Sequence, residues 1–190
     1  MPAPLNLSLS EAAAALRRGG LVAAPTEAVW GLSCDPLDQA AVMRLLEVKR
    51  RPIEKGLIVA AASLEQLRPL LDLDAVPAER LAAVAADWPG PFTWVLPAAA
   101  AAPRWVTGRH AGIAVRVTAH PQMAALCEAF GGALVSTSAN FASRPPAYRR
   151  GELDPALLPL LDGVLGEGDT GGLSQPTRIR DALTGEVVRA

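Results

Sequence analysis

Short apolar runs alternate with segments of helical spacing along most of this chain, and this alternation limits the possible folds more than any other feature. We expect strands at residues 21–24, 57–60, 92–96, 113–117 and 133–136. Apolar spacing, Pro and Gly predict helices at residues 11–18 (capped by Ser10), 41–48, 64–71, 78–87 and 121–130. The segments 178–180 and 186–189 flank a Leu-Thr-Gly turn and predict a terminal hairpin. The pattern indicates an α/β fold with a twisted mixed sheet flanked by helices.

The length of 190 residues suits one domain, and no linker divides it, so we predict a single domain over 1–190. No apolar run approaches the roughly 20 residues that a membrane-spanning helix needs. The first ten residues lack a basic segment followed by an apolar one, as an export signal would have. We therefore expect a cytoplasmic protein without a membrane partner.

Cysteine, histidine and net charge exclude several classes of site. Cys34 and Cys127 are too few for a disulfide framework or a four-ligand zinc site, and the two histidines, His110 and His120, form no H-x-x-x-H pair. We therefore expect no metal held by protein side chains. A net charge of −1 does not indicate a broad positively charged surface for nucleic acid, so any contact with tRNA should be weak or indirect.

Lysine is confined to one segment of the chain. Of 18 basic residues only two are lysines, Lys49 and Lys55, and both lie in the sequence Lys-Arg-Arg-Pro-Ile-Glu-Lys. Several neighbouring cations repel one another unless an anion lies among them, and a polyphosphate is a suitable anion. Neither a P-loop nor a dinucleotide-binding glycine motif is present. A solvated helix end remains the alternative.

Three further segments place polar side chains at or just after predicted strands. Residues 25–32 offer the Thr26 hydroxyl and the Trp30 ring, and residues 136–140 offer hydroxyl and amide groups that can cradle phosphate or ribose oxygens. Arg116 lies within an apolar strand and should face a cleft or a carboxylate. Purely structural alternatives remain: a turn packing its own aromatic ring, a helix-capping turn and a buried salt bridge.

Taken together, six collinear segments resemble the Sua5/YrdC-like family in its short single-domain bacterial form. They are residues 25–32, 49–59, 88–93, 114–121, 136–140 and 176–189, so the resemblance runs from about residue 20 to the end. It implies a mixed α/β sheet around a large, positively charged cavity. We expect no counterpart of the second domain of the longer Sua5-like form.

The resemblance also implies a reaction and its participants. Members of the family are nucleotidyltransferases that form L-threonylcarbamoyl-AMP and pyrophosphate from L-threonine, bicarbonate and ATP, with Mg²⁺. A separate transferase complex (TsaD/TsaB/TsaE-like) then modifies the adenosine beside the anticodon (t6A) of tRNAs that read ANN codons. This chain is expected to take the same substrates and the same downstream partner.

Individual residues match the family's motifs. By resemblance, the residues expected at ATP are Lys49, Arg51, Lys55, Ser138, Asn140 and Arg189, with Lys49 and Arg51 acting electrostatically and without a general base. Those expected at threonine or its carbamate are Thr26, Trp30, Arg116, Ser136 and Thr177. Ala28 departs from the pattern, since many relatives carry a second threonine there, and one hydroxyl contact is lost.

Two other functions compete with this one. The same basic cavity could serve a non-catalytic RNA-binding module, although the near-neutral charge and the lack of interleaved aromatic residues count against it. A carbamoyl-adenylate-forming relative is the other alternative, but such proteins carry C-x-x-C zinc modules that this chain lacks.

Overall fold

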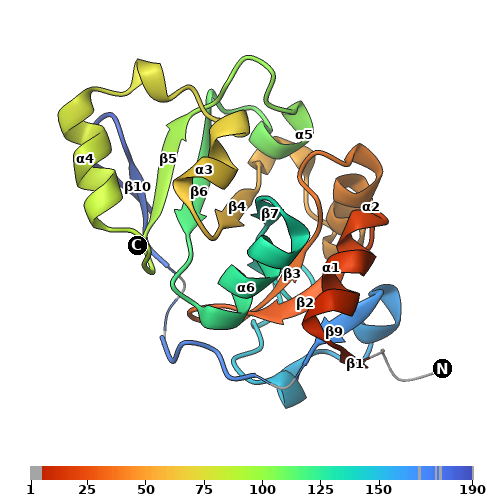
Figure 1. Cartoon of the computed structure of the whole chain (residues 1–190). Coiled ribbons are helices and arrows are strands. Elements are labelled where there is room, and N and C mark those ends of the chain that lie inside the picture. The colour runs from red at the N-terminus through yellow and green to blue at the C-terminus, as the bar shows by residue number, and fades with distance from the viewer. Residues whose placement is uncertain (1–5, 167, 174, 176, 190) are drawn as a thin grey trace.

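Two mixed sheets, rather than the single expected sheet, form the core of the protein (Figure 1). The computed structural model describes residues 6–166, 168–173, 175 and 177–189. The α-helices in this part are α1 (Leu9–Arg17), α2 (Gln39–Lys49), α3 (Leu64–Leu67), α4 (Ala78–Ala86), α5 (Arg104–Thr107) and α6 (Pro121–Phe130). The strands are β1 (Asn6–Leu7), β2 (Val22–Pro25), β3 (Trp30–Ser33), β4 (Ile58–Ala61), β5 (Thr93–Pro97), β6 (Gly112–Val117), β7 (Leu134–Val135), β8 (Thr137–Ser138), β9 (Gly163–Leu165), β10 (Ile179–Asp181) and β11 (Val187–Arg189). None of these helices has the length and apolar character required to cross a bilayer.

Helix ends follow the capping chemistry of the sequence. The predicted helix 121–130 is confirmed as α6, which Gly131 ends in the left-handed conformation. The predicted cap of α1 was wrong by two residues, because Ser8 rather than Ser10 caps it. The Ser8 side chain accepts from the Glu11 backbone N–H, and the Glu11 carboxylate accepts from the Ser8 N–H, which gives a reciprocal capping box.

The chain builds the two sheets by crossing between them. One sheet has the strand order β1-β9-β2-β3-β8 and the other β11-β10-β5-β6-β4-β7. After β7 pairs with β4, a single residue, Ser136, separates it from β8, which pairs with β3 in the other sheet. The predicted hairpin at the end of the chain is confirmed as the antiparallel pair β10–β11. The split was not predicted because the partner of so short a strand depends on contacts far away in sequence.

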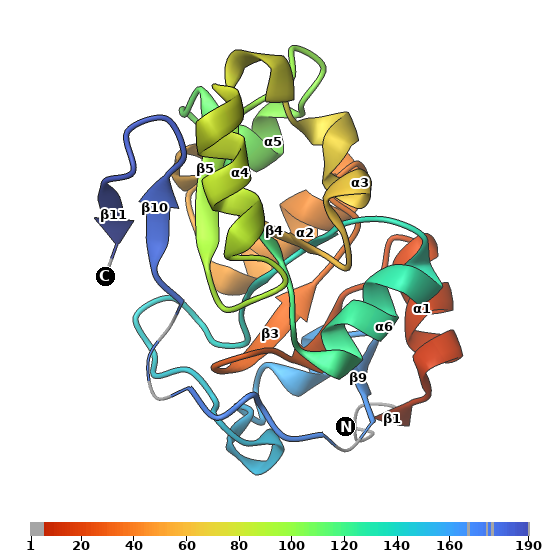
Figure 2. The same ribbon diagram turned by 60° about the vertical axis from the view of Figure 1, so that its left-hand side comes forward.

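Three apolar clusters hold the sheets and helices together. α2 packs on the first sheet, α3 and α4 lie against the second, and α1 and α6 lie side by side where the sheets meet (Figures 1 and 2). The cluster under α1 and α6 takes buried residues from both sheets, including Val22 of β2 and Ala60 of β4. Both cysteines, Cys34 and Cys127, are buried in these clusters.

Candidate active site

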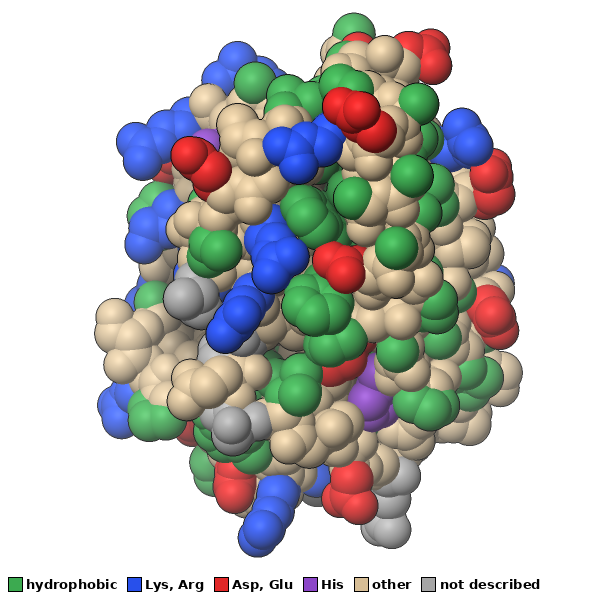
Figure 3. Space-filling view, turned by 90° about the vertical axis from the view of Figure 1, so that its left-hand side faces the viewer, with side chains coloured by type: hydrophobic (Ala, Val, Ile, Leu, Met, Phe, Trp, Pro, Cys, Tyr) green, Lys and Arg blue, Asp and Glu red, His purple; other side chains and the backbone are tan. Residues whose placement is uncertain are grey.

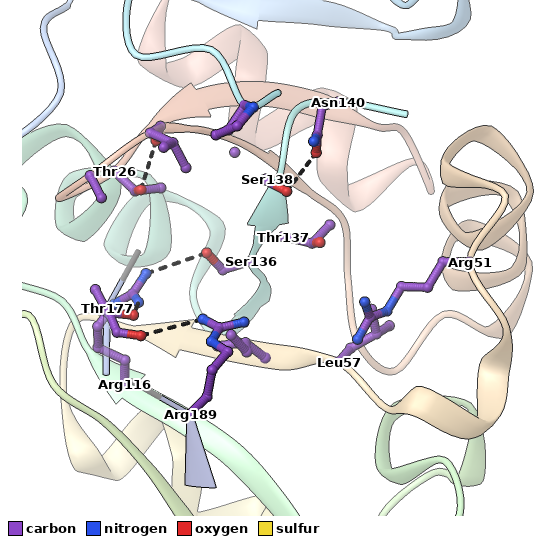
Figure 4. Close-up of a pocket in the computed structure, with 15 residues that line it drawn as sticks. Thr26, Arg51, Leu57, Arg116, Ser136, Thr137, Ser138, Asn140, Thr177 and Arg189 are labelled. Carbon is purple, nitrogen blue, oxygen red and sulfur yellow. Dashed lines mark hydrogen bonds between the residues drawn. The ribbon is translucent and has the colours of Figure 1, made fainter. Parts of the chain in front are cut away.

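A cavity of about 290 Å³ lies where the two sheets meet (Figure 4). It is lined by polar and basic side chains from segments far apart in the sequence. The predicted site residues among them are Thr26, Arg51, Arg116, Ser136, Ser138, Asn140, Thr177 and Arg189. The fold therefore brings most of the predicted site residues to one place.

The segment 136–140 forms one wall because it crosses from one sheet to the other. The backbone N–H of Ser136 donates to Ile58 O at 2.8 Å in the second sheet, and that of Ala139 donates to Trp30 O at 2.8 Å in the first. Between these anchors the Ser138 hydroxyl donates to Asn140 Oδ1 at 2.6 Å. The hydroxyl and amide groups of this wall are thus held in fixed positions.

Lys49 supports this wall from behind and does not line the cavity. Its side chain is 4% exposed, and its ammonium group donates to Ser138 O, to Asn140 O at 2.9 Å and to Asn140 Oδ1 at 3.2 Å. Burial, and then the charge of Arg51, lower the pKa of Lys49 to about 8. In this structure the ammonium holds the turn; direct phosphate binding by Lys49 stays a prediction.

Three arginines reach the cavity from different elements. In Figure 4, Arg116 of β6 and Arg189 of β11 lie on one side and Arg51, which follows α2, on the other. Burial and the Arg189 charge lower the pKa of Arg51, while burial and the Arg116 charge lower the pKa of Arg189. On the outer face that carries α4 and β10, Lys and Arg side chains also gather near the middle (Figure 3).

Arg116 has the largest set of polar partners in the site. Its Nη1 donates to the Thr177 hydroxyl at 2.9 Å and to the Thr93 hydroxyl at 3.3 Å. Its Nη2 lies 3.5 Å from the Ser136 hydroxyl and 3.3 Å from Glu27 Oε2. The alternatives predicted for this strand arginine, a cleft and a paired carboxylate, are therefore both present.

An adjoining cavity of about 170 Å³ contains the other lysine. It shares Arg51 and Arg189 with the first cavity and adds Lys55, Thr107 and His110. Lys55 is thus separated from the Ser138–Asn140 wall but lies beside two of the arginines. Its predicted contact with ATP stays a prediction.

Trp30 was expected to wall the amino-acid side, and the structure corrects this. Trp30 is the first residue of β3, fully buried in the apolar cluster under α2, and does not reach the cavity. Side chains alternate along a strand, so Gly31 faces the opposite way and lines the cavity. A Cβ on Gly31 would lie 3.2 Å from Thr137 O, so glycine permits the close approach of the two strands. Thr26 does line the cavity, with its hydroxyl donating to Val29 O at 2.7 Å.

Sequence reasoning missed three residues outside the cavity lining: Glu27 and Thr93, which contact Arg116, and Thr118, which donates a hydrogen bond to Glu27. Glu27 was visible as the acidic residue of the Pro-Thr-Glu motif, but nothing in the sequence showed which cation it faces. Thr93 and Thr118 lie within the segments 88–93 and 114–121 that carry the resemblance, but nothing in the sequence singled out either hydroxyl, because threonine at a strand or its end is common.

This arrangement is suited to binding more than one anion. The cavity lining contains three arginines and no carboxylate among the described residues. Within the same part of the chain, no three His, Cys, Asp or Glu side chains gather as metal ligands.

The family model Sua5_yciO_yrdC, described as "Telomere recombination", matches residues 14–190. The chain belongs to this family. It is 61% identical over 185 residues to the threonylcarbamoyl-AMP synthase of Stenotrophomonas maltophilia, covering 97% of this chain and 99% of the relative. It is 60% identical over 184 residues to that of Xanthomonas euvesicatoria pv. vesicatoria, covering 97% and 98%.

A solved structure shares the fold of this family member. The P. abyssi Sua5 complexed with L-threonine superimposes with a TM-score of 0.85 at 32% identity, over 93% of this chain and 53% of that one. The chain thus spans about half the length of the Sua5 protein, while it matches nearly the whole length of its bacterial relatives.

Proposed function

We propose that this chain is a threonylcarbamoyl-AMP synthase that forms L-threonylcarbamoyl-AMP and pyrophosphate from L-threonine, bicarbonate and ATP. The proposal rests on one observation: the arginines of a single cavity have two different kinds of surroundings. Arg51 and Arg189 have no carboxylate beside them in the lining, whereas Arg116 is surrounded by hydroxyl groups and Glu27. The relatives' name and the threonine in the Sua5 structure support this assignment.

The chemistry needs charge and position rather than a general base. Threonine's amine and bicarbonate condense, with loss of water, to a carbamate that is already anionic. Its oxygen then attacks the α-phosphorus of ATP, and the bond to pyrophosphate breaks. Arg51 and Arg189 would offset the negative charge on the phosphates, while Arg116, Ser136 and Thr177 would hold the amino acid. Mg²⁺ would enter with ATP.

The short lifetime of the product explains why we expect a downstream partner. An acyl adenylate is short-lived in water, so we expect it to be consumed at once by a transferase that modifies the adenosine beside the anticodon. We include the TsaD/TsaB/TsaE-like complex as this partner and the cytoplasm as the compartment. Contact of this chain with tRNA is not required by the proposal.

A substrate-omission assay tests the proposed reaction. Pyrophosphate release from purified protein should require ATP, threonine and bicarbonate together, in buffers purged of carbon dioxide. Mass spectrometry should detect threonylcarbamoyl-AMP in the complete mixture. Release at the same rate without bicarbonate would instead indicate an ordinary aminoacyl-adenylate and would refute the proposal.

A further inference from the structure

Glu27 is the only buried acidic side chain among the described residues. It lies in the turn after β2, beside the cavity, and is 5% exposed. The lining of the cavity itself contains Arg116 but not Glu27. An isolated buried carboxylate is costly, so its partners indicate its role.

Both the side chain and the backbone of Glu27 are held in place by hydrogen bonds. Its Oε1 accepts from the Thr118 hydroxyl at 2.6 Å and from the Ala119 backbone N–H at 3.3 Å. Its backbone carbonyl accepts from Leu173 N at 3.2 Å. A Cβ on Gly171 would lie 2.8 Å from that same carbonyl oxygen, so the segment passing over the turn is in close contact with it. The carboxylate therefore has little freedom to move.

The second carboxylate oxygen is directed at Arg116. Oε2 lies 3.3 Å from Nη2, within ion-pair distance but without hydrogen-bond geometry, and no described group donates a hydrogen bond to it. Thr177 and Thr93 hold the other nitrogen, Nη1. The guanidinium is thus held between a fixed carboxylate and two hydroxyls, with its Nη2 also near the Ser136 hydroxyl of the cavity wall.

Charge is distributed unevenly among the three arginines. Arg116 has a carboxylate at ion-pair distance, whereas no ion pair is found for Arg51 or Arg189 in the described part of the chain. A site that already contains a counter-charge attracts a singly charged carboxylate adequately but attracts a polyphosphate much less than an uncompensated cation does. The two anionic substrates should therefore prefer different ends of the cavity.

We propose that Glu27 is a positioning residue that orients Arg116 for the carboxylate of the amino-acid substrate and keeps phosphate groups away from it. This inference rests on the proposed function, because it requires an amino acid and a nucleotide in one cavity. Glu27 does not touch either substrate and acts only through Arg116.

Glu27→Gln tests the inference, because glutamine keeps the size and the Oε1 acceptor but removes the charge. We expect the KM for threonine to rise about 10- to 100-fold while the KM for ATP changes less than about threefold. In the wild type, added pyrophosphate should compete with ATP and not with threonine. In Glu27→Gln it should compete with threonine as well, which a merely structural role would not produce.

Matched variants separate charge from folding. Asp162→Asn removes the carboxylate of the exposed Arg44–Asp162 pair, at 2.7 Å and outside the cavity, and should leave both KM values and the inhibition pattern unchanged. Glu27→Asp keeps the charge and should keep pyrophosphate from competing with threonine. If Glu27→Gln does not fold, Thr118→Val removes one bond to Oε1 and should raise the threonine KM a few-fold.

Several results would overturn the inference. One is a folded Glu27→Gln variant whose KM for threonine equals that of the wild type. Another is an equal rise in its KM values for threonine and ATP. A third is that pyrophosphate still fails to compete with threonine in this variant. If Thr118→Val is used instead, an unchanged KM for threonine would also overturn the inference. Synthesis of threonylcarbamoyl-AMP by the wild-type protein in the same assay establishes the proposed function independently, so the two can fail separately.

Discussion

At the scale of single residues, the charged Lys49 side chain donates hydrogen bonds to three acceptors on one turn. The ammonium group bonds Ser138 O, Asn140 O and Asn140 Oδ1, which uses all of its donors. The lysine thereby fixes the turn that presents the Ser138 hydroxyl and the Asn140 amide to the cavity. We therefore expect Lys49 to influence ATP binding through this turn even without direct contact.

Replacing Lys49 should affect both catalysis and stability. In Lys49→Met, Ser138 O and Asn140 O lose their donor, which should lower the free energy of unfolding by about 1–3 kcal/mol. The loss of a charged hydrogen-bond donor should lower kcat/KM for ATP, by an amount that corresponds to about 2–3 kcal/mol of lost transition-state stabilisation. Urea unfolding and steady-state kinetics measure the two effects. Arg68→Met, a surface cation paired only with Glu65, is the control, and equal behaviour of the two variants would contradict the prediction.

The lowered pKa of Lys49 predicts opposite trends for activity and stability with pH. The folded protein releases this proton near pH 8, whereas the unfolded chain keeps it to about pH 10.5. Between these values the unfolded state binds more protons, so the contribution of Lys49 to stability increases with pH. The same loss of charge should lower kcat/KM for ATP above about pH 8. Lys49→Arg should show no such decrease; a decrease of the same size there would assign it to another group.

The kinds of side chain in the site could be predicted from the sequence better than the directions in which they point. The sequence singled out the two lysines and the strand arginine Arg116 as candidates for an anion site. Arg116 lines the cavity, whereas Lys49 does not and Lys55 lies in the adjoining cavity. Trp30 was placed at the cavity by resemblance, and no strand was predicted at residues 30–33. Once β2 and β3 form a hairpin, the pleat alone decides that Trp30 faces the core and Gly31 the cavity.

At the scale of elements, the basic segment after α2 is held by its crossing with the end of α5. Arg109 N donates to Glu54 O at 3.2 Å, and Leu57 N donates to Val106 O at 2.9 Å. At the crossing, Gly108 has a φ of +61°, and a Cβ there would lie 2.6 Å from both Glu54 O and Gly56 N. The crossing therefore requires glycine for two reasons, backbone conformation and space.

A pair of glycine variants separates these two reasons. Gly131 has a φ of +92°, but a Cβ there would meet nothing within 4 Å. Gly131→Ala should cost only the left-handed conformation, about 1–2 kcal/mol of unfolding free energy. Gly108→Ala should cost more than this and also raise the KM for ATP, because the segment carrying Arg51 and Lys55 must shift. Equal costs, with ATP kinetics unchanged in both, would show that the crossing does not position the basic segment.

Elements with strong periodicity could be predicted, and very short ones could not. Pro121 and Gly131 bounded α6 correctly because each favours its end of a helix. The two-residue strands β7 and β8 carry too few side chains to show a period of two. Sequence reasoning therefore placed one strand at 133–136, where the chain in fact crosses between sheets at Ser136.

At the scale of the whole molecule, the cavity is built from both sheets at once. Thr26 and Ser138 come from the first sheet or its turn, and Arg116 and Arg189 from the second. The alternation of strands and helices predicted the α/β class but not the division into two sheets, since that division depends on long-range pairing. A ligand that fills the cavity must contact both sheets.

Substrates should therefore stabilise the protein as a unit. A ligand at about 100 times its Kd adds about 2.7 kcal/mol to the free energy of unfolding. For a domain of this size this corresponds to a rise in Tm of roughly 5–11 °C. Differential scanning calorimetry with MgATP should show one transition at higher temperature. Two transitions, only one of them shifted, would mean that the sheets unfold independently.

The burial of both cysteines makes the protein convenient for site-directed fluorescence. Burial raises the pKa of Cys127 to about 12 and that of Cys34 beyond the ordinary range of thiols. Because maleimide dyes react with thiolates, neither native cysteine competes for label at neutral pH while the protein is folded. Leu37→Cys, beside the first sheet, and Leu183→Cys, after β10 of the second, introduce exposed thiols without removing any native residue of the core. Energy transfer between two such dyes can report how the sheets approach each other as substrates enter.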